Sequence, residues 1–206
     1  MIKTMIAIEY NVLMTILKFL GDMMPIISMD YGMNGVNVQI LPAYPADLTS
    51  LKKPSIIVRK VDTRQSKVGI GNVLGQYFNN DENRYYDIVG KMHEIMIQID
   101  VVSSNSTMRA LLESMVADGI FNHTAYTNGG KIILYDFTVN EKAPTQIGCI
   151  KLISDPMVRD LYDDKSTDMN YIGIIRHKLS VVQTIVPKQE YVDLSKWVKQ
   201  TYKIIL

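Results

Sequence analysis

The sequence predicts an α+β protein with a mainly antiparallel sheet, an N-terminal amphipathic helix and a second helix packed on the sheet. Three observations predict this class. Apolar residues recur at helical spacing over residues 5–20, residues 84–102 alternate between polar and apolar side chains, and a well-capped helix follows them directly. The order helix, strands, helix, strands differs from the regular alternation of a doubly wound parallel fold.

Length and charge indicate one ordinary globular domain. The chain has 206 residues, and we expect residues 1–206 to form a single domain with residues 188–206 as a C-terminal arm. Lys and Arg number 22 against 21 Asp and Glu, so the formal net charge is +1. This balance argues against a dedicated nucleic-acid binder. Cys149 is the only cysteine, so no disulfide can form within the chain, which favours a reducing compartment.

The N-terminal segment predicts an amphipathic helix rather than a signal or membrane segment. Glu9, Asn11 and Lys18 interrupt its apolar run, and a membrane span needs roughly 18 or more apolar residues. Gly21 is suited to end this helix. The apolar stripe comprises Met5, Ile8, Val12, Leu13, Ile16 and Leu20.

Residues 22–83 are expected to hold loops and two strands. Proline and glycine punctuate residues 22–35, which predicts a loop or short extended pieces. Residues 36–40 alternate as a half-buried strand does, and residues 55–64 form a second strand-like segment after a proline-rich loop. Residues 65–83 are rich in glycine and asparagine and predict a long loop or an open hairpin.

The clearest strand and the clearest helix follow one another directly. Every second residue from His93 to Val101 is apolar apart from His93, and the residues between them are largely polar, which predicts a strand with one solvated face. Residues 103–119 predict a helix whose apolar stripe includes Leu112 and Met115. Candidate caps of this helix are Ser104, Asn105 and Ser106 at its start and Gly119 at its end.

The remainder of the chain is rich in strand patterns. Residues 131–140, 147–153 and 171–187 carry β-type patterns. Between the last two, the acidic residues of segment 155–168 predict a solvated loop, because their spacing does not match a calcium-binding loop. Residues 191–206 predict a short helix or an extended arm.

No catalytic, cofactor or metal motif emerges from the sequence. None of the three histidines has a partner at metal-ligand spacing, and no serine lies in a nucleophile elbow. The glycines of residues 69–75 miss the dinucleotide-binding spacing by one residue. Cys149 is expected to be a small buried hydrophobe. We therefore expect a protein that is not an enzyme and that carries no cofactor or metal.

Interaction surfaces are the remaining candidates for function. Basic residues recur from Lys52 to Lys67, which predicts a solvated strand face or an electrostatic contact with an acidic protein or a nucleic-acid backbone. Four methionines between residues 23 and 33 either pack in the core or form an adaptable exposed patch. The candidate interface residues are Lys52, Lys53, Arg59, Lys60, Arg64, Lys67, Gly69, Gly71, Gly75, Tyr77 and Phe78.

The long strand and its helix resemble those of the tail terminator proteins of tailed bacteriophages, especially phages with contractile tails. In that family a long strand ending in a pattern like Ile97-Gln-Ile-Asp-Val runs into a helix opened by small polar residues, as it does here. The segment Lys53-Pro-Ser-Ile-Ile-Val-Arg and the N-terminal amphipathic helix also fit, so the resemblance covers residues 1–140. Tail terminators have no catalytic residues that could be assigned to positions of this sequence.

The resemblance implies a virion protein, made in the cytoplasm of the bacterial host and located in the tail or neck. It implies a ring, usually of six copies, that caps the tail tube, stops its growth and offers a surface for head–tail joining. The implied partners are other copies of the chain, the tail tube protein, and the sheath and neck or head-completion proteins. Genomic DNA would pass through the lumen without sequence-specific contact, and no membrane is involved. The alternatives are another neck, tail-completion or baseplate component, or a small α+β nucleic-acid-binding module.

Overall fold

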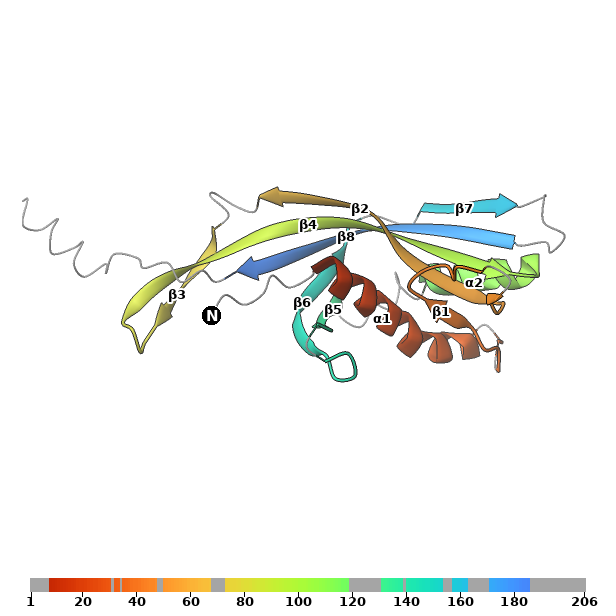
Figure 1. Cartoon of the computed structure of the whole chain (residues 1–206), viewed down its shortest axis with the longest axis horizontal. Coiled ribbons are helices and arrows are strands. Elements are labelled where there is room, and N and C mark those ends of the chain that lie inside the picture. Colours follow the sequence, from red (N-terminus) through yellow and green to blue (C-terminus); the bar gives the residue numbers. More distant parts are fainter. Residues whose placement is uncertain are drawn as a thin grey trace, which may run out of the picture. The chain divides into compact units, whose positions relative to one another are not determined.

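The computed structural model describes residues 8–30, 32–33, 35–47, 50–67, 73–118, 131–138, 140–153, 157–162 and 171–185. Within these ranges the chain forms two helices and a mainly antiparallel sheet, which confirms the predicted α+β class (Figure 1). The helices are α1 (Ile8–Asp30) and α2 (Ser106–Asp118). The strands are β1 (Gln39–Leu41), β2 (Ser55–Lys67), β3 (Val73–Asn79), β4 (Arg84–Ser103), β5 (Lys131–Asp136), β6 (Thr145–Leu152), β7 (Met157–Tyr162) and β8 (Tyr171–Ile185).

The strands form one sheet in the order β1-β2-β4-β8-β6-β5, with β3 paired to β4 and β7 paired to β8. β1 runs parallel to β2, whereas β3, β6 and β7 run antiparallel to their partners. The described residues belong to two compact units. The first unit comprises described residues of Met1–Arg64 and Glu94–Val181, and the second comprises those of Gln65–His93 and Val182–Leu206. Both helices belong to the first unit, as does nearly all of the core.

Both helices cover the same face of the sheet in the first unit. Val12 and Ile16 of α1 and Leu112 and Met115 of α2 belong to one buried apolar cluster. The strand residues of this cluster include Ile56, Ile95, Ile97, Ile99, Ile150, Ile175 and Leu179. Figure 1 shows α1 and α2 on the same side of the long strands. We call the face beneath the helices the inner face of the sheet and the opposite face the outer face.

Helix α1 is longer than the sequence predicts, because it continues through Gly21 and Pro25 to Asp30. Glycine inside a helix costs about 1 kcal/mol relative to alanine. The burial of Met23 and Met24 beyond it offsets that cost. The predictions of a cap at Gly21 and of a loop over residues 22–30 are therefore wrong, since tertiary packing outweighs local propensity, whereas the described residues from 32 to 35 are a turn as predicted. Of the two interpretations of the methionines, these two side chains support packing in the core.

The true end of α1 has the geometry of a Schellman motif. Gly32 has a φ of +67°, in the left-handed region that glycine adopts without strain. The Met33 N–H donates to the Ser28 carbonyl over 2.8 Å, which is the bond between C″ and C3 in that motif. Met33 is buried, so the chain turns back onto the helix as soon as it ends.

The elements between α1 and β4 are partly as predicted. The strand expected over residues 36–40 is observed only at β1, and β2 extends beyond residue 64 to Lys67. For residues 65–83 the hairpin alternative is right, because β3 pairs with β4 from Val73↔Val89 to Asn79↔Arg84. Extended pairing with a long neighbouring strand explains how a glycine-containing segment becomes a strand here.

β4 and α2 confirm the strand and helix predicted between residues 84 and 119. The Asn105 Oδ1 accepts hydrogen bonds from the backbone N–H groups of Thr107 and Met108, at 2.8 and 3.3 Å. Asn105 is thus the N-cap of α2. The apolar stripe is buried at Leu112 and Met115, as expected.

Two sequence expectations about the second half of the chain are wrong. The acidic segment contains a strand, β7, in which Asp160 lies opposite Gly173 of β8. Pairing along the long strand β8 makes this short piece extended despite its charges. Cys149 is exposed rather than buried. Its neighbour Ile150 faces the core, and successive strand residues point to opposite faces.

Several expectations concern residues outside the described part of the chain. They include His123, Trp197, the C-terminal arm and the acidic residues Asp155, Asp163, Asp164 and Asp168. Gly69 and Gly71 of the candidate interface also lie outside it. These expectations stay predictions.

Candidate functional site

The end of the β3–β4 hairpin is a two-stranded ribbon with exposed aromatic side chains. Tyr77 lies opposite Tyr86 with ring centroids 5.4 Å apart, and Phe78 lies opposite Tyr85 at 4.9 Å. Because consecutive strand residues point to opposite faces, each face of the ribbon carries one aromatic pair. Tyr77, Phe78 and Tyr85 are 39%, 41% and 38% exposed. A two-stranded ribbon is marginally stable in water by itself, so this surface is suited to being covered by a partner.

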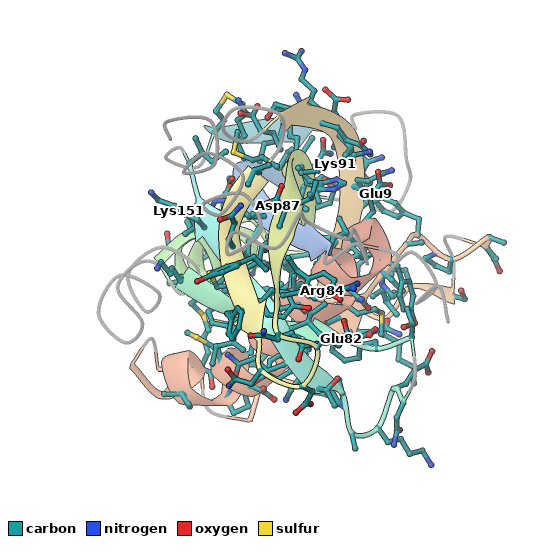
Figure 2. The ribbon with its side chains drawn as sticks, turned by 90° about the vertical axis from the view of Figure 1, so that its left-hand side faces the viewer. Glu9, Glu82, Arg84, Asp87, Lys91 and Lys151 are labelled. Carbon is teal, nitrogen blue, oxygen red and sulfur yellow. The ribbon has the colours of Figure 1, made fainter. Side chains whose placement is uncertain are left out.

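The turn that closes the hairpin is held by its own polar side chains. The Asn79 Oδ1 accepts a hydrogen bond from the backbone N–H of Asp81 at 3.1 Å, and Asn83 adopts a left-handed φ of 51°. The Tyr86 hydroxyl donates to the Glu82 carboxylate, and this hydrogen bond raises the pKa of Tyr86. Asp81 and Glu82 are exposed. The turn therefore presents two carboxylates in a defined backbone conformation. Glu82 is labelled in Figure 2.

A buried polar network lies on the outer face of the sheet. The Gln98 Nε2 donates to the Asp100 Oδ1 at 2.6 Å, and the Arg176 Nε donates to the Gln98 Oε1 at 2.9 Å. The Arg59 Nη2 lies 3.1 Å from the Asp100 Oδ2. Asp100 is 1% exposed although it belongs to the polar series of β4. The predicted solvated face is therefore wrong at these positions, because polar partners from β2 and β8 cover them.

Tyr44, in the loop before β2, completes this network. The Arg59 guanidinium lies 5.8 Å from the centre of the Tyr44 ring, within cation–π range. Burial, together with the charge of Asp100 and a hydrogen bond to it, raises the pKa of the Tyr44 hydroxyl. The network fixes the Arg59 side chain, which is still half exposed. An exposed cation that is held in place can contact a partner at little cost in side-chain entropy.

The basic stretch predicted as an interface is largely paired with acids of the same chain. Arg59 contacts Asp100, and Lys60 forms an ion pair with Glu9 of α1. Arg64 lies 3.6 Å from its neighbour Asp62. These pairs reduce the positive field of β2 and favour the interpretation as a solvated strand face over a dedicated polyanion site.

The other predicted interface residues are spread over several elements. Lys52 is exposed and Lys53 is half-buried in the loop before β2, and Lys67 is the last residue of β2. Gly75 lies at the irregular register of β3, while Tyr77 and Phe78 lie at the hairpin end. The structure thus brings Tyr77 and Phe78 together, and sequence reasoning missed their cross-strand partners Tyr85 and Tyr86.

Helix α1 closes one edge of the sheet. The backbone N–H of Tyr135 donates to the Thr15 Oγ1 at 3.2 Å, and that of Phe137 donates to the Asn11 Oδ1 at 2.9 Å. The Asn11 Nδ2 in turn donates to the Asp136 Oδ1 at 3.1 Å. Asn11 and Thr15 are buried. Side chains of α1 therefore occupy backbone donors at the end of β5, so this part of the sheet edge is covered.

A polar group of residues is buried beneath β8. The Arg109 Nη1 lies 3.8 Å from the Glu113 Oε2 on α2, and both side chains are nearly enclosed. A Cβ at Gly173 would stand 2.9 Å from the Glu113 carboxyl carbon, so glycine allows this close approach. His177 is fully buried, and its burial lowers its pKa to about 4. These groups have no access to a substrate and act in packing.

A groove of about 520 Å³ lies between the second half of α1, the segment after it and α2. Its walls include Gly21, Met24, Met33, Val36 and Met115. A Cβ added at Gly21 would meet no atom within 4 Å, so the groove is open at that point. Its lining is mainly apolar and offers no reactive group.

Metal-binding clusters and membrane-spanning helices are both absent from the described ranges. There, no three His, Cys, Asp or Glu side chains gather as a metal site would require. Within the same ranges, neither helix has the length and apolar character needed to cross a membrane.

Comparisons with known proteins give little further guidance. No protein-family model matches the chain, and no curated protein sequence matches it. Among solved structures, it is similar to a chain of the "Virion of native gene transfer agent (GTA) particle", with 9% identity and a TM-score of 0.37. This similarity covers 85% of the present chain and 98% of the other one. At that TM-score the two chains share only a partial arrangement of elements, which carries no information about function.

Proposed function

We propose that this chain is a structural virion protein of the tail terminator type. Copies of it would form a ring that caps the end of a phage tail tube, stops tube growth and supports head–tail joining. The observation that carries the proposal is the aromatic end of the β3–β4 hairpin. Tyr77, Phe78 and Tyr85 are exposed together on a narrow ribbon that has too little surface to bury them itself.

Tyrosine and phenylalanine are enriched at protein–protein interfaces because they bury a large area with few rotatable bonds. The hairpin end presents such residues on both of its faces. The outer face of the sheet adds a half-exposed Arg59 that is fixed by Asp100 and Tyr44. Two different surfaces on one chain are what a head-to-tail contact needs, and head-to-tail contacts generate rings when the rotation closes.

The assignment to a tail rests on the resemblance of the long strand and its helix to tail terminators. In this protein the two form one β–α unit, in which Asn105 caps α2 immediately after β4. The unit places Leu112 and Met115 against the inner face and leaves the other end of β4 to the hairpin. The same strand thus supplies both the core and the surface proposed for assembly.

The proposal is tested by solution mass from light scattering, for the chain alone and mixed with a tail tube protein from the same particle. A closed oligomer, or a monomer that becomes a ring only on the tube, is expected. In electron micrographs, added protein should also stop tubes from growing further. A monomer that leaves the length and ends of the tubes unchanged would contradict the proposal.

A matched pair of variants separates the hairpin from general surface effects. Phe78→Ser removes one exposed aromatic side chain from the hairpin end, and Ile26→Ser removes an apolar side chain from α1 that is more exposed still, at 58% against 41%. We expect Phe78→Ser to weaken ring formation or tube capping about tenfold or more, since interface anchors of this kind contribute ~1–2 kcal/mol or more. Ile26→Ser should assemble normally. Equal effects of the two changes would show that the hairpin end has no specific role in ring formation or tube capping.

A further inference from the structure

Two lysines lie directly opposite each other on the outer face of the sheet. Lys131 of β5 and Lys151 of β6 are register partners, and both are exposed. Like charges in directly opposed positions destabilise a sheet. No described residue forms an ion pair with either lysine. An acidic group of another molecule would lower the repulsion between the two lysines.

The positive charge continues along β8. Lys151 is the register partner of Ser180, and strand alternation places Lys178 and Arg176 on the same face as Ser180. Lys178 is paired with Glu94 at 2.8 Å. We define the basic stripe as Lys131, Lys151, Lys178 and Arg176. With Glu94 included, its net charge is +3, from four cations and one anion. In Figure 2 the Lys151 side chain stands out from the ribbon.

Apolar side chains are interleaved with the basic stripe. Met157 lies opposite Arg176 and is 54% exposed, and the backbone N–H of Ile153, which is 44% exposed, donates to the Lys178 carbonyl at 2.9 Å. A nucleic-acid backbone would leave these two side chains without a matching surface, because such interfaces are strongly polar. A protein segment that combines carboxylates with aromatic rings matches both features.

The hairpin end of this chain has that combination. Asp81 and Glu82 are exposed at the turn, next to exposed Tyr77, Phe78 and Tyr85. Arg84 follows them, so the turn has a net charge of −1 from two carboxylates and one guanidinium. The carboxylates can pair with Lys131 and Lys151, and the aromatic faces can receive lysine or arginine cations together with Met157.

We infer that the basic stripe of one copy receives the β3–β4 hairpin end of the next copy. The inference rests on the proposed function and adds the two surfaces that meet in the ring. The contact is heterologous, because the stripe and the hairpin end are different surfaces, so each copy uses one of each. The repulsion between Lys131 and Lys151 is lowered only when the neighbour is present, which links sheet stability to assembly.

Charge reversal in both surfaces tests the contact by sedimentation velocity. Lys131→Glu with Lys151→Glu reverses the stripe, and Asp81→Lys with Glu82→Lys reverses the hairpin end. Each double variant alone should lose self-association by about tenfold or more, since attraction becomes repulsion. A mixture of the two should recover assemblies in which the variants alternate. All four changes in one chain should restore self-association, because both surfaces are reversed together.

Controls make each outcome decisive. Lys18→Glu with Lys142→Glu makes the same change in charge at two exposed lysines outside the stripe and should leave self-association unchanged. Circular dichroism confirms that each variant is folded. The inference would be overturned if both double variants had the wild-type mass, or if the variant with all four changes did not regain self-association. Salt-dependent duplex DNA binding that only the stripe variant loses would also overturn it. A chain that caps tubes but never self-associates would overturn this contact and leave the proposed function standing.

Discussion

The two faces of the sheet in the first unit are built from the same strands but held by different forces. On the inner face, Ile97, Ile99 and Leu179 are buried against the helices. On the outer face, the residues between them form hydrogen bonds and ion pairs, from the enclosed Asp100 to the half-exposed Lys178. The inner face is stabilised by apolar area, which ionic screening does not weaken, whereas the outer face depends on charge.

This difference separates folding from assembly. Truncation of a buried isoleucine typically costs 2–5 kcal/mol, whereas an exposed ion pair contributes about 0–1 kcal/mol. Changes on the inner face should therefore destabilise the fold, and changes at the exposed part of the outer face should alter contacts with other chains while stability is largely kept. The predictions below follow this order.

The largest effect is expected from Ile97→Ala on the inner face. Ile97 is buried among α1, α2 and the neighbouring strands, so truncation loses its burial and leaves a cavity. We expect the free energy of unfolding to fall by about 2–5 kcal/mol in urea titrations. Val61→Ala, at an exposed position of β2, should change it by less than about 0.5 kcal/mol. Similar losses in the two variants would contradict the assignment of the core.

The next effect is a pH dependence from His177 on the inner face. Burial lowers the pKa of His177 to about 4, while an unfolded histidine titrates near 6.5. Between these values the unfolded state binds a proton that the native state does not, so stability falls as pH falls from about 6.5 to about 4. The full loss is about 3 kcal/mol from the difference between the two pKa values.

The measurement is urea unfolding across that pH range, for the wild type and for His177→Leu. The leucine variant has no titrating group at this position, so this part of the pH dependence should disappear. An unchanged profile would show that His177 is charged or accessible in the native state.

The inner face could largely be predicted from the sequence, because its signals are local. The alternation from Ile95 to Val101 and the stripe with Leu112 and Met115 each predict one buried face without knowledge of the partner. Where local signals conflicted with packing, prediction failed. Gly21 and Pro25 indicate a helix end, but buried Met24 keeps the helix intact.

The outer face could not be predicted, because its properties depend on register. The sequence shows that Asp100 is polar, but only strand pairing brings Gln98, Arg59 and Arg176 to it. The pairing of Lys131 with Lys151 likewise joins strands whose register no local pattern fixes. The hairpin end could be predicted only in part, because the sequence indicates Tyr77 and Phe78 as interface residues but not their cross-strand partners on β4.

A smaller effect is expected from Asp100→Ala in the buried part of the outer face. The change leaves the Gln98 amide without its acceptor and removes the partner of Arg59. Because Arg59 is half exposed and can return to water, we expect a loss of about 2 kcal/mol rather than the larger loss of a fully buried pair. Asp100→Asn keeps an acceptor and should lose less. Chemical denaturation ranks the two variants, and a larger loss for asparagine would contradict the network.

The smallest effect on stability is expected from Lys178→Ala, at the exposed part of the same face. Its ion pair with Glu94 at 2.8 Å is accessible to water, so removing it should change the unfolding free energy by less than about 1 kcal/mol and less still at high salt. The same change removes one cation from the basic stripe and should weaken self-association several-fold in sedimentation. A variant that loses stability but associates normally would show that Lys178 acts in folding, as the inner-face residues do, rather than in assembly. Normal stability with weakened self-association is the result expected if the exposed part of the outer face serves contacts with other copies.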